Sequence, residues 1–324
     1  MGQVRPELDM ALELQDAVQG RPPRTATWKG YASGLAADLT NYRSGNWKPL
    51  GCAVALYQVR PGTLATPEAR RIVAEWVDYY AASRDAFMGT EFGSRIYGPW
   101  HVLSNLAVAA WSEQAFPDNP SALDWLAAWW HLCARLRAPD GQILMIGQRS
   151  GGHPTTPGWF EYIHARASGE GLQQAEAWGK AAGLGIKQSW MYHVLNALQP
   201  TLSRSFARAM SMPAPEVTLR RPLTLIRTDS GMAAYLGNDP ESGIDWSNDN
   251  GNTTPVVAAT WQDGVARYLP DNGGIRLRQK FERCKVVERD GMLIYDSDVN
   301  GHQELPIPGN ERSRTTHYRR PVAL

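Results

Sequence analysis

A short segment at residues 151–162, GGHPTTPGWFEY, carries a histidine near one end and a tyrosine at the other. Imidazole and phenol groups both transfer protons in enzymes, so His153 and Tyr162 are candidates for acid–base chemistry. The glycines and prolines predict an irregular loop over most of the segment. An alternative interpretation is a connecting loop whose aromatic side chains, Trp159 among them, cover the ends of helices. Long loops often carry functional residues, so both interpretations stay open.

Two pairs of polar residues recur at a spacing of four. His101 and Asn105 follow YGPW, and Arg204 and Arg208 lie in LSRSFARAM. Residues four apart share one face of a helix. Two guanidinium groups on one face can clamp a carboxylate by bidentate hydrogen bonds. Solvent-exposed polar positions explain each pair equally well.

The sequence predicts no metal and no cofactor. The turn-like stretch DWSNDNGNTT at residues 245–254 does not fit a calcium-binding EF-hand loop, because Gly251 at the sixth position puts Trp246 first and Val257 last. The three cysteines lack the spacing of a zinc site. Glycine-rich phosphate loops, HExxH and G-x-S-x-G are all absent, which disfavours nucleotide, zinc-protease and esterase chemistry.

The composition is that of an ordinary globular protein. With 33 basic and 32 acidic side chains, the net charge of +1 predicts neither nucleic acid nor a membrane surface as a partner. The 13 tryptophans suit either a hydrophobic core or the faces of sugar rings. No apolar run is long enough to span a bilayer. We expect a cytoplasmic protein, or an extracellular or periplasmic one from which a signal peptide was removed.

Periodicity predicts helices first and strands later, hence an α+β fold. Helices are expected at 66–87, 98–114, 121–138 and 172–198, and strands at 217–227, 231–237, 254–261 and 275–281. A hairpin is expected around Asp290-Gly291, because Asp-Gly suits a type I′ turn. We therefore predict a helical domain at 1–212, built as an array of α-hairpins, and an antiparallel β domain at 213–324.

Several motifs, taken in order over residues 98–262, resemble the polysaccharide lyases of family 8, which act on hyaluronate, chondroitin and xanthan. In that family an α/α toroid precedes a large antiparallel β region. The motifs are Asn105, the turn Asp140-Gly141, His153 with Tyr162 nine residues on, the segment RSFARA at 204–209 and NDNGN at 248–252.

The resemblance implies β-elimination on a uronic-acid polysaccharide, without metal or cofactor. Tyr162 would take the proton beside the carboxylate and then protonate the leaving oxygen, while nearby arginines lower its pKa from about 10. The implied catalytic residues are Asn105, His153, Tyr162 and Arg208, and the implied substrate-binding residues are Trp100, Arg149, Trp159, Arg204 and Asn252.

Two other functions fit the same predicted fold. A glycoside hydrolase would need two carboxylates flanking the bond, for which Asp140, Glu161 and Asp245 are candidates. A sugar-binding or assembly protein without catalysis is the other alternative, since fold does not determine function. The sequence predicts no oligomeric state.

Overall fold

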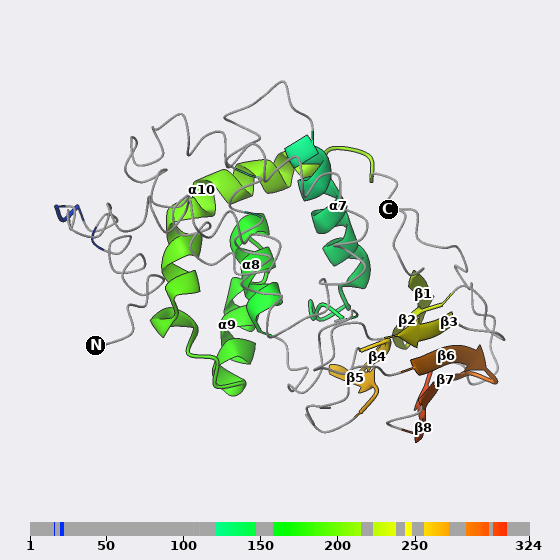
Figure 1. Cartoon of the computed structure of the whole chain (residues 1–324). Coiled ribbons are helices and arrows are strands. Elements are labelled where there is room, and N and C mark those ends of the chain that lie inside the picture. Colours follow the sequence, from blue (N-terminus) through cyan, green and yellow to red (C-terminus); the bar gives the residue numbers. More distant parts are fainter. Residues whose placement is uncertain are drawn as a thin grey trace, which may run out of the picture. The chain divides into compact units, whose positions relative to one another are not determined.

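The computed structural model describes part of the chain, and the described part forms two compact units (Figure 1). The first unit includes 121–130 and 158–213, and the second includes 131–146 and the strands that follow residue 222. Each unit is therefore made of separate segments of the chain, and the two-domain boundary near residue 213 stays a prediction. The described residues are Asp16, 20–22, Leu106, Ala110, 121–144, Ile146, 158–214, 223–237, 244–247, 256–271, 283–297 and 301–309.

The described residues contain four α-helices and one 3-10 helix. α8 packs against α9 and α10. The helix predicted at 172–198 is interrupted because Gly183 and Gly185 adopt left-handed backbone angles. The helices are α7 at Ser121–Leu136, α8 at Trp159–Ser168, α9 at Leu172–Ala181, the 3-10 helix η2 at Ile186–Gln188 and α10 at Trp190–Met210.

Aromatic packing fills the core of the helical unit. Trp130 is 1% exposed and meets Phe206 edge-on, with ring centroids 5.0 Å apart. Trp129 packs on Phe160 at 6.2 Å. Leu106 and Ala110 are helical and fully buried. Trp129 and Trp130 are therefore core residues and offer no surface for a sugar ring.

The predicted loop at 151–162 is wrong for its last four residues. Helix α8 begins at Trp159, so Tyr162 is helical. The Glu161 carboxylate accepts a 2.6 Å hydrogen bond from the backbone N–H of Gly158, which satisfies an N-terminal donor of the helix. A side chain at Gly158 would clash with Leu184. The rest of the segment, 151–157, lies outside the described residues.

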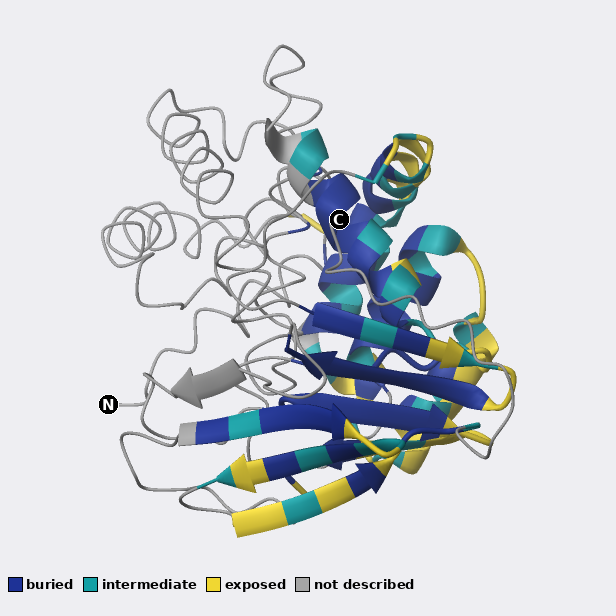
Figure 2. Cartoon of the chain, turned by 90° about the vertical axis from the view of Figure 1, so that its right-hand side faces the viewer, coloured by how far each residue is buried: buried dark blue, intermediate teal, exposed yellow. Residues whose placement is uncertain are grey.

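The second unit contains two antiparallel four-stranded sheets, with strand orders β1-β2-β4-β5 and β3-β6-β7-β8. Strand β2 is buried along its whole length, whereas the edge strand β8 is largely exposed (Figure 2). The first sheet comprises β1 at Leu223–Thr228, β2 at Gly231–Leu236, β4 at Ala258–Gln262 and β5 at Val265–Leu269. The second comprises β3 at Ile244–Ser247, β6 at Arg283–Arg289, β7 at Met292–Ser297 and β8 at Gly301–Pro306.

Two Asp-Gly turns join neighbouring strands. At Asp290 and Gly291 both φ angles are positive, 49° and 78°, which confirms the predicted hairpin between β6 and β7. The turn at Asp263-Gly264, with φ angles of 50° and 82°, joins β4 to β5 and was not predicted. The same dipeptide signal was present there and was overlooked.

One arginine fixes the end of α7 to the first sheet. Arg227 on β1 donates to the backbone oxygens of Arg135 at 2.6 Å and Arg137 at 3.3 Å. These carbonyls lie at and beyond the C-terminus of the helix, where cations are favourable. Burial lowers the pKa of Arg227 from its usual value.

Other predicted elements lie outside the described residues. They are the helix at 66–87, most of the helix at 98–114 and the strand at 275–281. The toroid that the resemblance implies depends on these regions, so it stays a prediction.

Candidate functional site

Four of the nine predicted site residues belong to the described part of the chain. Tyr162 and Trp159 lie on α8, and Arg204 and Arg208 lie on α10. The other five, Trp100, Asn105, Arg149, His153 and Asn252, lie outside the described residues.

Tyr162 is buried inside the helical unit. The side chain is 0% exposed, and its hydroxyl has no hydrogen-bond partner among the described residues. Trp159 meets the tyrosine ring edge-on, with centroids 5.9 Å apart and planes at 89°. Burial raises the pKa of Tyr162 to about 12, and the nearby charge of Arg166 opposes that rise only in part. The predicted lowering of this pKa is therefore wrong.

Arg204 and Arg208 lie on the exposed side of α10, one turn apart. Ser205, between them in sequence, is fully buried. Neither guanidinium contributes to the shift in the pKa of Tyr162. Because both side chains face solvent, the described structure gives them the character of an exposed basic stripe.

Arg166 is the cation beside Tyr162, and the sequence analysis missed it. Its Nη2 donates to Oδ1 of Asn196 on α10 at 2.6 Å. Its Nε is buried and has no acceptor among the described residues. The available sequence signal was the spacing, since residues 162 and 166 are four apart and share one helix face.

Two of the three carboxylates considered for hydrolysis have structural hydrogen bonds. Glu161 is 4% exposed and accepts the N–H of Gly158. Asp140 accepts from the backbone N–H of Gln142 at 3.0 Å and from its side-chain Nε2 at 2.6 Å. Asp245 lies in β3, pairing in register with Lys285. Asp140 and Glu161 therefore act as hydrogen-bond acceptors for nearby groups of the chain.

His164, next to the predicted site, is a core residue. It is 6% exposed and meets the rings of Trp130 and Phe206 edge-on, with centroids 5.8 and 5.5 Å away. Its Nδ1 is 3.5 Å from the hydroxyl of Ser168. The surrounding rings give it a packing role.

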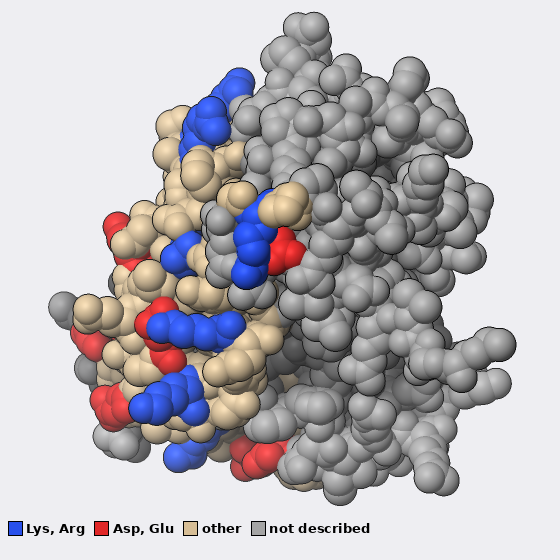
Figure 3. All heavy atoms as spheres, turned by 90° about the vertical axis from the view of Figure 1, so that its left-hand side faces the viewer, with Lys and Arg blue, Asp and Glu red and all other residues tan. Residues whose placement is uncertain are grey.

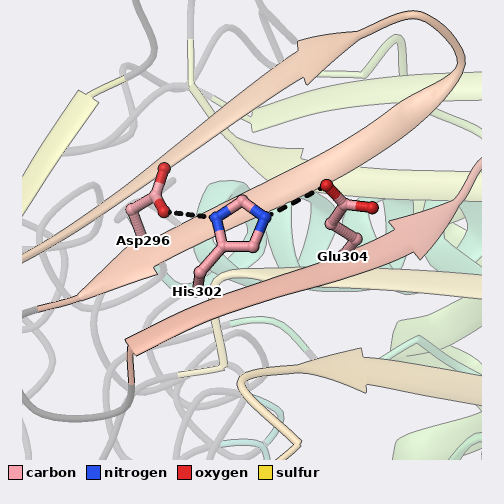
Figure 4. Close-up of polar contacts among 3 residues, drawn as sticks. All are labelled: Asp296, His302 and Glu304. Carbon is pink, nitrogen blue, oxygen red and sulfur yellow. Dashed lines mark hydrogen bonds and ion pairs between the residues drawn. The ribbon is translucent and has the colours of Figure 1, made fainter.

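A separate polar cluster lies on the neighbouring strands β7 and β8 of the second sheet (Figure 4). Nδ1 of His302 is 2.6 Å from Asp296, and Nε2 is 3.0 Å from Glu304. Ionised carboxylates only accept hydrogen bonds, so both contacts are satisfied together when the imidazole is protonated and donates from both nitrogens. These two hydrogen bonds raise the pKa of His302. The two nitrogens face different carboxylates, so the three groups do not converge on one ion.

The described residues on one face of the molecule show no dominant charge. Figure 3 shows basic and acidic side chains interspersed on one face, as the net charge of +1 suggests. Among the described residues, no group of three His, Cys, Asp or Glu side chains is arranged to hold a metal. No helix in the described part of the chain is long and apolar enough to cross a membrane.

Comparisons with protein-family models, with curated proteins and with solved structures found no match. The side chains themselves, above all those around Tyr162, therefore provide the evidence for a function.

Proposed function

We propose that this protein is a lyase that cleaves a uronic-acid polysaccharide by β-elimination, with Tyr162 in its active site. The order of Asn105, His153, Tyr162 and the arginine-rich segment 204–209 supports this class of reaction. The observation that carries the proposal is the buried hydroxyl of Tyr162, which has no partner among the described residues.

A buried hydroxyl without a partner is costly. Leaving such a group unsatisfied costs about 1–3 kcal/mol, and most buried polar groups in proteins are hydrogen-bonded. A phenylalanine at position 162 would fill the same space without that cost. A hydroxyl that meets an oxygen of the substrate explains why a tyrosine stands there, since function often opposes stability.

The raised pKa decides which proton transfer Tyr162 can perform. At pH 7 a phenol with a pKa of about 12 is ionised in roughly one molecule in 100,000. Tyr162 therefore acts as the acid, giving its proton to the leaving glycosidic oxygen. This replaces the earlier expectation that it first acts as the base.

The base must then be another group. His153 is the candidate, because an imidazole with a pKa near 6.5 accepts protons at neutral pH. The base takes the proton from the carbon beside the uronate carboxylate, the C–O bond breaks as the C=C bond forms, and the leaving oxygen receives the proton of Tyr162. Exchange with solvent restores both groups.

Ultraviolet absorbance of the product tests this proposal. Elimination leaves an unsaturated uronate that absorbs, whereas hydrolysis leaves none. We expect rising absorbance with at least one of hyaluronan, chondroitin, xanthan or alginate, and its loss in Tyr162→Phe. The matched control is Tyr235→Phe, which removes a fully buried hydroxyl from strand β2 and should keep the activity.

Three results would contradict the proposal. Full activity in Tyr162→Phe would remove the tyrosine from the mechanism. New reducing ends without absorbance would indicate hydrolysis instead. Polysaccharide binding without any product would favour the alternative of a sugar-binding protein.

A further inference from the structure

One face of α8 presents two buried hydrogen-bond donors one turn apart. The hydroxyl of Tyr162 and Nε of Arg166 are both buried, and neither has a partner among the described residues. Their spacing of four places them on the same helix face. A guanidinium Nε can only donate, and a protonated phenol can donate as well. The missing partner common to both is an acceptor.

Among the described residues, no carboxylate forms an ion pair with the guanidinium of Arg166. Its one side-chain contact in the described structure is the neutral amide oxygen of Asn196, 2.6 Å from Nη2. Charged side chains that leave water are almost always paired, because desolvation of an unpaired charge is expensive. Arg166 is only partly buried, so solvent still reaches part of the side chain.

Asn196 holds the guanidinium in one orientation. The hydrogen bond joins α8 to α10, two helices that pack against each other. The hydroxyl of Ser203, also on α10, donates to the backbone oxygen of Arg166 at 3.4 Å. These contacts fix the guanidinium and the backbone below it. A binding group that is held in place in advance loses less entropy when a ligand arrives.

We propose that Tyr162 and Arg166 form a binding site for a carboxylate, and that Asn196 positions the guanidinium within it. Arg166 supplies one positive charge and a planar set of donors, which match one carboxylate in charge and shape. A phosphate dianion would require more charge than this site provides. The charge of Arg166 also lowers the pKa of Tyr162 against the larger effect of burial, as expected for groups one helical turn apart.

The identity of the carboxylate as that of a uronic acid rests on the proposed function, whereas the site itself does not. A carboxylate held by Arg166 would lie beside the phenol that gives up its proton. Arg166 would then also neutralise the charge that develops at the carboxylate during elimination. Arg204 and Arg208, the arginines expected for this role, face solvent.

Binding of free glucuronate, a single sugar without a bond to cleave, tests the site without catalysis. Isothermal titration of the full chain should show that glucuronate binds and that glucose, which lacks the carboxylate, does not. Arg166→Gln should weaken glucuronate binding about 10- to 100-fold, the range for a hydrogen bond to a charged group. Arg166→Lys keeps the charge without the planar donors, so its affinity for glucuronate should lie between those of the wild type and Arg166→Gln. Lys180→Gln, which removes an exposed charge from α9, is the control and should bind like the wild type.

The site is refuted if glucuronate does not bind, if glucose binds equally well, or if Arg166→Gln and Arg166→Lys both bind like the wild type. Tryptophan fluorescence reports whether each variant is folded, and Arg166→Lys carries the test if the glutamine variant is not. Glucuronate binding that depends on Arg166, together with no elimination product, would support the site and refute the lyase. Product formation with an unchanged KM in Arg166→Gln would support the lyase and refute the carboxylate site.

Discussion

Replacing Tyr162 by phenylalanine separates a functional hydroxyl from a structural one. The substitution removes one oxygen and keeps the ring that meets Trp159 edge-on at 5.9 Å. Because the side chain is 0% exposed and its hydroxyl has no partner among the described residues, folding gains nothing from that oxygen. Removing an unsatisfied buried hydroxyl relieves a cost of about 1–3 kcal/mol in the folded state. Allowing for partial relaxation, we expect Tyr162→Phe to be neutral or about 1 kcal/mol more stable.

The matched variant Tyr235→Phe should behave in the opposite way. Tyr235 is also fully buried, but its hydroxyl donates to the Glu288 carboxylate at 3.3 Å. Its removal leaves a buried carboxylate with one hydrogen bond fewer, at a cost of about 1–2 kcal/mol. The two tyrosines lie in different compact units, so each variant reports on the transition of its own unit.

Urea unfolding followed by tryptophan fluorescence measures both effects. Buried indoles on α7 and the buried Trp261 on β4 give each unit a reporter. A Tyr162→Phe variant that loses 1 kcal/mol or more would show that the hydroxyl has a structural partner, which would refute the reasoning behind the proposed site. Greater stability combined with lost activity is the outcome that the proposed function requires.

Three further predictions concern the second unit. His302 should titrate by NMR with a pKa above its usual value of 6.5, and Asp296→Asn should lower that pKa; a midpoint at or below 6.5 in the wild type would contradict the double hydrogen bond. Because the pKa of His302 is raised in the folded state, its contribution to stability is full below the unfolded pKa and is lost as the pH rises through the folded pKa. Gln142→Ala should lower the free energy of unfolding, measured in urea, by about 1–3 kcal/mol, because the buried amide donates to Asp140 and, at 2.7 Å, to the backbone oxygen of Gly264. The control is Gln262→Ala at an exposed position, and an equal effect in both variants would contradict a structural role for the Gln142 amide. Gly291→Ala should cost about 1 kcal/mol at φ 78°, measured as a shift of the thermal midpoint, and no shift would mean that the turn tolerates a side chain.

Local signals in the sequence predicted a substantial part of the described fold. The pattern at 121–138 predicted a helix, observed as α7 at Ser121–Leu136, and Asp290-Gly291 predicted the hairpin between β6 and β7. Both depend on neighbouring residues alone, through side-chain periodicity and the positive φ angles of a tight turn. The start of α8 was misplaced because the glycines and prolines before it are a strong loop signal, and they end at the helix cap, Gly158.

Local patterns were insufficient for the candidate site. Spacing identified Arg204 and Arg208 as a clamp, but spacing gives no information about which side of α10 is covered. The role of Arg166 depends on Asn196, 30 residues away on another helix. Likewise Glu161 was a candidate carboxylate by type, and only its hydrogen bond to Gly158 reveals the cap.

The sequence by itself determined the near-zero net charge, the order of helices before strands and the Asp290-Gly291 turn that joins β6 to β7. These follow from residue types and from spacings of a few positions. Only the tertiary structure decided that Tyr162 is buried, that its pKa is raised to about 12 and that Arg166 is the cation beside it. The physical reason is that burial and electrostatic environment depend on which distant segments exclude water from a side chain, and helix packing sets this.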